Sequence, residues 1–485
     1  MTMKNNKNIY FVFLSVLLGG VGALSFPPYN LFFFGLISYG SLFLISHYSQ
    51  SIKQALLLSF FWGIGFHVSG LWWIAEALLV DGNPYRWAYP LAVLGLPALL
   101  SIFVVITALI YRRIVQNLAM SAMCSALLFA VLFSGAEWLR GNILTGFPWN
   151  LPAYIWSEQL EVLQALRVFG AYGLSALTLI LSMLLGALVI ERTRKTFIGV
   201  GTITLLFVVI TLLGYQRLEN APTYVPSPDL FIRIVQPNIA QSQKWDPDKY
   251  IDHLYQFRDI SISNIPEGEQ KRALLIFPET ALNDVMMSTV EARDALNNIV
   301  KAYENKGMEL FILTGALRSH INNENREYYN SALLYDKEGY IVDDYDKSHL
   351  VPFGEYIPFS NIINIAPIVQ FSGFQSGSGA KSLHHKSLPS IAVAICYEII
   401  FPKKLFSKED KPELIVTITN DAWYGDTAGP YQHYMMARYR AIEEQLPVLR
   451  SANTGISGGF DPFGRAFPSL KINESGYIDI VSSEN

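Results

Sequence analysis

The first 216 residues contain a series of apolar stretches, each close to the length needed to cross a lipid bilayer. A spanning helix needs about 20 mostly apolar residues. Charged side chains are correspondingly scarce, because residues 1–220 hold only 19 of the 76 Asp, Glu, Lys and Arg residues of the chain. We therefore predict a membrane domain of about seven helices over residues 1–216. The expected helices lie near 9–26, 29–47, 54–80, 88–111, 117–137, 168–190 and 197–215.

The first apolar stretch has a second interpretation, as a cleaved signal peptide. Lys4 and Lys7 precede it, and small residues surround Ala23 near its end. The apolar part of a signal peptide is usually about 7–15 residues long, which is shorter than this stretch. Six further apolar stretches also follow, so we favour a spanning helix.

The distribution of Lys and Arg predicts the orientation of the membrane domain, because cytoplasmic segments of membrane proteins carry an excess of both. With the N-terminus in the cytoplasm, eight of these residues fall in inside segments and three in outside loops. The inside set is Lys4, Lys7, Lys53, Arg112, Arg113, Arg192, Arg194 and Lys195, and the outside set is Arg86, Arg140 and Arg167. Seven crossings then place everything after residue 216 on the outer face. In a two-membrane bacterium this predicts a multi-pass inner-membrane protein with its C-terminal part in the periplasm.

Three ionisable residues lie in or beside the predicted outside loops, namely Glu76, Glu137 and Arg140. Ionisable groups at membrane depth are costly and often functional. We hypothesise that they line a polar crevice below the C-terminal domain. The alternative is that they sit at the water boundary.

The rest of the chain has the composition of a soluble domain, with 57 charged residues in 221–485. A Pro-rich linker is expected over 217–229, followed by the soluble domain over 230–485. Apolar runs typical of buried strands alternate there with helical patterns, which predicts a layered α/β domain. Strands are expected at 230–236, 274–277, 310–315, 332–335, 340–343, 391–396, 413–419 and around 458–459, and helices at about 247–264, 288–305 and 431–445.

Polar residues recur just after expected strand ends, at Glu279, Lys347 and Cys396. Catalytic groups in α/β folds gather beyond strand termini. A thiol with a carboxylate base and an ammonium group is a workable set for acyl transfer. The carboxylate would take the thiol proton, while the ammonium group would lower the thiol pKa below its free value of about 8.5 and stabilise an oxyanion.

Each of these residues also has a structural interpretation. A free Cys is most often a small buried hydrophobe. Glu279 could cap a following helix, and Lys347 could be a surface cation. The only other cysteine, Cys124, lies in a predicted membrane stretch, so a structural disulfide with Cys396 is not expected.

Short motifs around the three polar residues carry a family resemblance. Pro278-Glu279, Tyr345-Asp-Lys347 and Ile395-Cys-Tyr-Glu398 resemble the Glu–Lys–Cys triad motifs of the nitrilase (carbon–nitrogen hydrolase) superfamily. Longer motifs along nearly the whole chain resemble the apolipoprotein N-acyltransferase family. These are Glu137-Trp-Leu-Arg140, Gly146-Phe-Pro-Trp149, Val235-Gln-Pro-Asn238, Lys244-Trp245, Lys347 through Pro358, Thr419 through Gly425, and Arg450 through Gly455.

This resemblance implies a multi-span α-helical membrane domain followed by a soluble α/β nitrilase-like αββα sandwich domain. It implies transfer of an acyl chain, typically from the sn-1 position of a phospholipid, to the α-amino group of an N-terminal diacylglyceryl-cysteine in an apolipoprotein. The reaction would be ping-pong, with Cys396 as nucleophile, Glu279 as general base and Lys347 stabilising the oxyanion.

The same resemblance implies supporting roles for four further residues. Glu355 would be a second carboxylate at the site, Tyr397 and Glu398 would shape it beside the nucleophile, and Trp245 would be a lid or substrate contact. No metal or organic cofactor is implied, since no His, Cys or Asp cluster has ligand spacing. The expected partners are the phospholipid donor, the apolipoprotein acceptor and the bilayer. No basic tract suggests nucleic acid, and a monomer is expected.

Two other functions remain open from the sequence. A membrane-bound nitrilase-type amidase or hydrolase would give the thioester to water. A non-enzymatic lipid-binding protein would retain the triad as a relic. The family usually ends with a further transmembrane helix, and residues 476–485 contain no apolar run of that length, which leaves open how the far edge of the domain is held.

The segment from Phe353 to Phe374 is rich in apolar residues and contains one charge, Glu355. A soluble domain seldom exposes so much apolar surface without a partner. We hypothesise a mobile lid that touches the bilayer and admits acyl chains. The alternative is that the segment packs on its own core.

Overall fold

The computed structural model describes residues 2–81, 83–224, 227–283, 289–322, 325–358 and 373–481. The chain forms two compact units: Met1–Ala75 with Trp87–Ala221, and Glu76–Arg86 with Pro222–Asn485. Most of the predicted lid, residues 359–372, lies outside the described residues.

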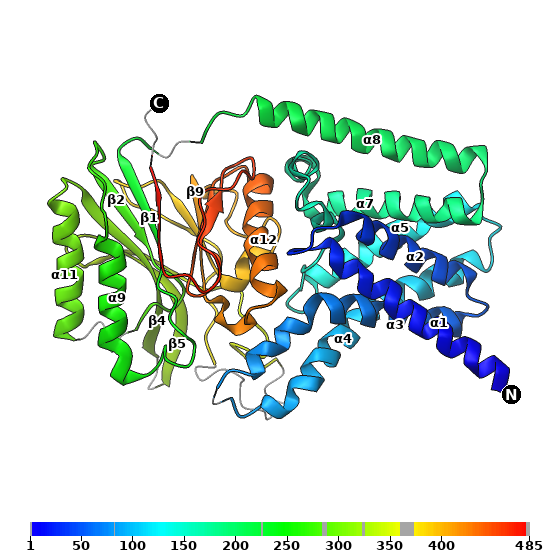
Figure 1. The fold of residues 1–485 in the computed structure, drawn as a ribbon, viewed down its shortest axis with the longest axis horizontal. Helices are drawn as coiled ribbons and strands as arrows, with labels where there is room; N and C mark the ends of the chain where they lie inside the picture. Colours follow the sequence, from blue (N-terminus) through cyan, green and yellow to red (C-terminus); the bar gives the residue numbers. More distant parts are fainter. Residues whose placement is uncertain are drawn as a thin grey trace. The chain divides into compact units, whose positions relative to one another are not determined.

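The first unit consists of helices (Figure 1). They are α1 (Thr2–Gly20), α2 (Phe32–Tyr48), α3 (Ile52–Leu71), α4 (Tyr89–Val115), α5 (Ala122–Asn142), the short α6 (Leu160–Leu163), α7 (Leu166–Ile190) and α8 (Arg194–Glu219). Five helical segments among the described residues are long and apolar enough to cross a membrane: Ile52–Leu78, Arg86–Val115, Ala122–Asn142, Leu166–Ile190 and Arg194–Glu219. Two shorter apolar segments, Ile9–Ser25 and Phe32–Tyr48, coincide with the first two predicted helices. The number of crossings stays a prediction.

Polar residues at the starts of three of these helices explain where they begin. Ser51 accepts a hydrogen bond from the Gln54 amide at the start of α3, and Ser121 does the same for Cys124 at the start of α5. Thr193 caps α8 through the amide of Thr196. Each side chain satisfies one of the backbone N–H groups that a helix leaves unpaired at its first turn.

The predicted crevice residues Glu137 and Arg140 form a buried ion pair within α5. The two residues are only 5% and 3% exposed, and Arg140 Nη2 lies 2.5 Å from Glu137 Oε2. Arg140 Nη1 also donates to the carbonyl oxygens of Phe147 and Trp149, at 2.5 and 3.0 Å. The pair therefore fixes the segment that follows α5. A buried charge is tolerated only when it is paired in this way.

The second unit contains two β-sheets. The first sheet has the strand order β12-β1-β2-β4-β5-β6, with β3 paired to β4, and the second has the order β11-β10-β9-β8-β7. The first-sheet strands are β1 (Leu230–Gln236), β2 (Arg272–Ile276), β3 (Leu282–Asn283), β4 (Glu309–Asn322), β5 (Asn325–Tyr335), β6 (Ile341–Asp346) and β12 (Gly476–Ile480). The second-sheet strands are β7 (Ser382–Leu383), β8 (Ile391–Ile395), β9 (Leu414–Thr419), β10 (Val448–Ala452) and β11 (Gly458–Phe460).

Helices cover the outer faces of both sheets. Helices α9 (Tyr250–Ile262) and α11 (Val290–Glu304) pack on the first sheet, and α12 (Ala428–Glu444) lies on the second (Figure 1). The unit is thus the four-layered αββα sandwich that was expected for the C-terminal half, and this prediction is confirmed.

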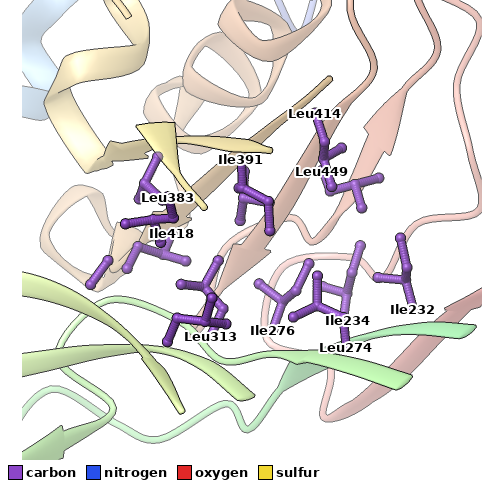
Figure 2. Packing of buried hydrophobic residues seen from close by; sticks show 14 of the residues in the cluster. Ile232, Ile234, Leu274, Ile276, Leu313, Leu383, Ile391, Leu414, Ile418 and Leu449 are labelled. Atoms are coloured by element: carbon purple, nitrogen blue, oxygen red, sulfur yellow. The ribbon is translucent and has the colours of Figure 1, made fainter. Parts of the chain in front are cut away.

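The core between the sheets explains why the strands read as continuous apolar runs. Side chains of successive strand residues point to opposite faces. Ile232 and Ile234 of β1 therefore face the second sheet, whereas Phe231 and Val235 face α9 and α11. Both faces are buried, so both sets are mainly apolar. Figure 2 shows Ile276 and Leu313 of the first sheet meeting the side chains of the second, among them Ile391, Ile418 and Leu449.

Candidate active site

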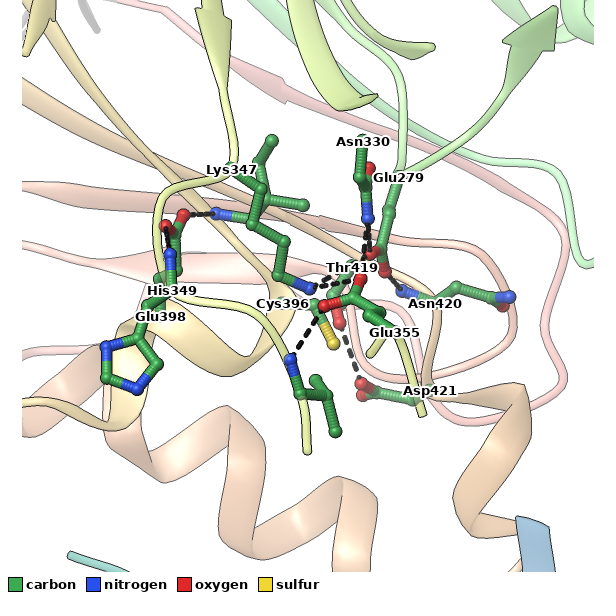
Figure 3. Close-up of polar contacts among 12 residues, drawn as sticks. Glu279, Asn330, Lys347, His349, Glu355, Cys396, Glu398, Thr419, Asn420 and Asp421 are labelled. Atoms are coloured by element: carbon green, nitrogen blue, oxygen red, sulfur yellow. Dashed lines mark hydrogen bonds and ion pairs between the residues drawn. The ribbon is translucent and has the colours of Figure 1, made fainter. Parts of the chain in front are cut away.

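The sandwich brings the three predicted catalytic residues together at strand ends. Glu279 follows β2, Lys347 follows β6, and Cys396 follows β8. Lys347 Nζ lies 3.6 Å from Glu279 Oε1 (Figure 3). All three residues are buried, with exposed fractions of 6%, 1% and 7% for Glu279, Lys347 and Cys396. A carboxylate, an ammonium group and a thiol thus share one site shielded from water.

Glu355 completes a carboxylate pair around Lys347. Lys347 Nζ donates to Glu355 Oε1 at 2.8 Å, which is closer than its contact with Glu279. The Asn330 side-chain amide donates to both carboxylates, at 2.7 Å to Glu279 and 3.0 Å to Glu355. The backbone amide of Asn420 donates to the other oxygen of Glu279 at 2.9 Å. These bonds fix the orientation of the Glu279 carboxylate.

Cys396 sits on a tight turn between β8 and a short 3₁₀-helix, Cys396–Ile400. Its φ is 52°, in the left-handed region that non-glycine residues rarely adopt. Such conformations concentrate at functional sites, where surrounding structure enforces them. The turn carries the side chain from the apolar strand into the site formed by Glu279 and Lys347.

Glu398 and Tyr397 hold this turn from one side. Glu398 Oε2 accepts from the amide of Ile395 at 2.8 Å. Its Oε1 accepts from the amides of Ser348 and His349 at 2.9 and 3.0 Å, and from the Tyr345 hydroxyl at 2.7 Å. The Tyr397 ring packs beside the rings of His349 and Phe401. Both residues therefore lie beside Cys396, and their role in shaping the site stays a prediction.

Trp245 lies near the Glu279 turn. Together with Lys244, Pro278 and Thr280 it lines a small cavity. The neighbouring Lys244 is buried, and its Nζ donates to the backbone oxygen of Glu279 at 2.9 Å. Burial lowers the pKa of Lys244 to about 8. The Trp245 segment is thus joined to the site through Lys244.

The electrostatics of the thiol differ from the expectation. Burial and the Glu279 carboxylate raise the pKa of Cys396 to about 12, and the opposing effect of Lys347 is smaller. The expectation that Lys347 holds the thiol pKa below about 8.5 is therefore wrong. Burial raises this pKa more than the positive charge of Lys347 lowers it. Burial acts to lower the pKa of Lys347, but Glu355 and Glu279 outweigh it and hold that pKa well above its ordinary value. The resting pair is a thiol and an ammonium ion.

This arrangement predicts the pH dependence of Cys396 alkylation. Only the thiolate reacts, so the rate with iodoacetamide should rise about tenfold per pH unit from pH 7 to 10 without levelling near 8.5. The rate would be followed by mass spectrometry in a Cys124→Ser background, because Cys124 is exposed. A rate that levels off at or below pH 8.5 would show that the thiol pKa is not raised.

Sequence reasoning missed three residues that build the site: Asn330, Lys244 and Gly315. Asn330 lies in a polar part of β5, where nothing in the sequence indicates that it bridges two carboxylates. Lys244 adjoins Trp245 in a motif noted above, which was the available signal. Gly315 lies on β4 beside the turn of Glu279, and only the register of β2 and β4 places it there.

A side chain at position 315 is expected to disturb the Glu279 turn. A Cβ there would lie 2.5 Å from the Thr280 amide nitrogen and 2.6 Å from Glu279 Cα. We expect Gly315→Ala to destabilise the protein by about 1–3 kcal/mol, as overpacked cores generally do, and to reduce turnover. Thermal unfolding in detergent would measure the first effect. The control is Gly95→Ala, since nothing lies within 4 Å of a Cβ at that position; equal unfolding temperatures for the two variants would contradict the prediction.

Comparisons with known proteins agree with both units. Residues 231–473 match the family model "Carbon-nitrogen hydrolase", which fits the sandwich and its strand-end site. Residues 18–184 match the model "Apolipoprotein N-acyltransferase N-terminal domain". The fold and the site thus define a nitrilase-type domain joined to a set of membrane helices.

Curated relatives specify the family further. A Brucella melitensis protein named apolipoprotein N-acyltransferase is 36% identical over 481 residues, covering 96% of this chain and 88% of the relative. A Rhizobium rhizogenes protein of the same name is 34% identical over 493 residues, covering 97% and 89%. The chain belongs to the apolipoprotein N-acyltransferase family. It is a membrane protein of a lipid-modifying acyltransferase family.

Among solved structures, Saccharomyces cerevisiae Nit3, a member of branch 10 of the nitrilase superfamily, is 15% identical. The match covers 54% of this chain and 93% of that chain, with a TM-score of 0.37. This likeness is too weak to add to the family assignment.

Proposed function

We propose that this protein transfers an acyl chain from a phospholipid to the N-terminal α-amino group of a diacylglyceryl-cysteine apolipoprotein, through a thioester on Cys396. The observation that supports it most is the meeting of Glu279, Lys347 and Cys396 in one buried site. Membership of the apolipoprotein N-acyltransferase family supplies the substrates. The five apolar helical segments favour a lipid donor taken from the bilayer.

In the first half-reaction the Cys396 thiol attacks the ester carbonyl of the phospholipid. Glu279 takes the thiol proton as the sulfur–carbon bond forms. No free thiolate is then needed, although burial raises the pKa of the Cys396 thiol. The Lys347 ammonium group stabilises the tetrahedral oxyanion. When the intermediate collapses, the ester carbon–oxygen bond breaks. The lysophospholipid leaves as an alcohol with the proton from Glu279, and a thioester remains on Cys396.

In the second half-reaction the α-amine of the apolipoprotein attacks the thioester carbonyl. Glu279 accepts the proton that the amine loses, and Lys347 again faces the oxyanion. The carbon–sulfur bond then breaks, and Glu279 returns a proton to the sulfur. The products are the N-acylated lipoprotein and the free thiol, so one residue serves as base and acid in both halves.

The proposal includes the arrangement expected from the sequence. Residues 1–216 would form the inner-membrane domain with a cytoplasmic N-terminus, residues 217–229 the linker, and residues 230–485 a periplasmic catalytic domain. The protein would act as a monomer. The bias of Lys and Arg between the two sides supports this orientation.

The test is the intact mass of the purified protein after incubation with phospholipid alone. The proposal predicts a gain of one acyl chain that hydroxylamine removes. Cys396→Ala should show no gain, whereas Cys124→Ser, the matched change at the other cysteine, should keep it. Free fatty acid without an adduct would point to a hydrolase. The absence of both an adduct and lipid turnover would refute the proposal.

A further inference from the structure

The left-handed turn at Cys396 needs support on both of its sides. Glu398 binds the amide of Ile395, which precedes the nucleophile. That contact leaves the carbonyl side of Cys396 to be held by another group. A residue with φ of 52° and a side chain does not keep this conformation unless its surroundings impose it.

His433 supplies the contact on the carbonyl side. It lies on α12 and is completely buried, and its Nε2 is 3.1 Å from the carbonyl oxygen of Cys396. A carbonyl oxygen only accepts hydrogen bonds, so Nε2 carries a proton and donates it. The ring therefore touches the backbone of the nucleophile and does not serve as the base for its thiol.

A second set of buried groups holds the His433 ring in place. Its Nδ1 lies 2.9 Å from Asp421 Oδ1 and 3.2 Å from Arg450 Nη2. Asp421 in turn binds the Thr419 hydroxyl at 3.0 Å and Arg450 Nη2 at 2.5 Å. The side chains of His433, Asp421 and Arg450 have no exposed surface. Asp421, which follows β9, and Arg450 of β10 thus position the ring, and the ring positions the Cys396 carbonyl.

We propose that His433 is a positioning residue for acyl transfer, which holds the Cys396 carbonyl and thereby keeps the thiol directed into the Glu279–Lys347 site. This inference rests on the proposed function, since it assigns His433 to thioester formation. A small displacement of a reacting group is enough to slow a reaction about 100-fold. Loss of the Nε2–H donor should therefore affect the chemical step more than substrate binding.

The experiment compares His433→Leu with His433→Gln in the Cys124→Ser background. Leucine fills the space without a donor, whereas the glutamine amide offers an N–H near the position of Nε2. We expect His433→Leu to form the thioester about 100-fold more slowly than the parent, with KM changed less than threefold. We expect His433→Gln to form the thioester at least tenfold faster than His433→Leu. Alkylation of Cys396 by iodoacetamide should become faster in His433→Leu, because the released thiol is less buried.

The destabilised control is Asp479→Ala, which removes the ion-pair partner of the buried Arg233 in the first sheet. Assays are run well below the unfolding temperature of every variant, and this control should keep parental thioester and alkylation rates. The inference is overturned if His433→Leu matches the parent in both rates, or if His433→Gln is as slow as His433→Leu. Failure of the parent itself to form a thioester would instead refute the proposed function, and the alkylation rates would still test the role of His433.

Discussion

Replacing Glu279 by glutamine is expected to lower the rate of thioester formation by about 10²–10⁴-fold, the contribution typical of a positioned general base. Glutamine keeps the size of the side chain but cannot take a proton. The effect should be large here because burial raises the pKa of Cys396 to about 12, so the thiol does not ionise unaided at neutral pH. Stopped reactions with phospholipid, followed by intact mass, would measure the rate.

The matched control is Glu267→Gln, since Glu267 is an exposed carboxylate paired with Lys306. It should form the thioester at the parental rate. The Glu279 variant should also keep the parental fold by circular dichroism. Thioester formation within threefold of the parent in folded Glu279→Gln would exclude this residue as the base.

Replacing Lys347 by methionine is expected to reduce both activity and stability. Removal of one oxyanion-stabilising group typically costs about 10²–10³-fold in kcat. The change also leaves Glu279 and Glu355 without the ammonium group that lies 3.6 and 2.8 Å away. Breaking a buried ion pair in this way costs about 3–5 kcal/mol. Turnover and thermal unfolding would be measured on the same preparation.

A second substitution separates the two effects of Lys347. Adding Glu355→Gln to Lys347→Met removes one of the two unpaired carboxylates, so the unfolding temperature should rise again while turnover stays low. Lys381→Met, which breaks a half-exposed pair with Asp343, should alter neither property. If the double variant regained turnover along with stability, the oxyanion role of Lys347 would be wrong.

Much of the fold follows from patterns that the sequence displays directly. The apolar runs ending near Gln236, Ile276 and Ile395 are strands because both of their faces are buried. The strands β4 and β5 extend well beyond the predicted 310–315 and 332–335, through polar residues such as Arg318. These parts of the strands pair with each other without a continuous apolar run, so hydrophobicity could not reveal them.

The candidate site was predictable to the extent that it depends on strand ends. Glu279, Lys347 and Cys396 could be grouped because each follows a strand, and the structure brings them together. Asn330 could not be found, since its role depends on the pairing of β5 with β4 and β6. His433 was equally hidden, because it acts from a helix on a backbone atom of the nucleophile. The thiol pKa was misjudged because sequence shows which charges are present but not how deeply they are buried.

The bonds of Glu398 have a mechanical consequence. One of its oxygens accepts hydrogen bonds from the two residues after Lys347, at the end of a strand of the first sheet. The other accepts from the residue before Cys396, at the end of a strand of the second sheet. A single carboxylate therefore links the two sheets of the sandwich. If one sheet shifted relative to the other, these bonds would be expected to move Lys347 and Cys396 together. The distance between Lys347 and Cys396 is therefore expected to change little when the two sheets shift.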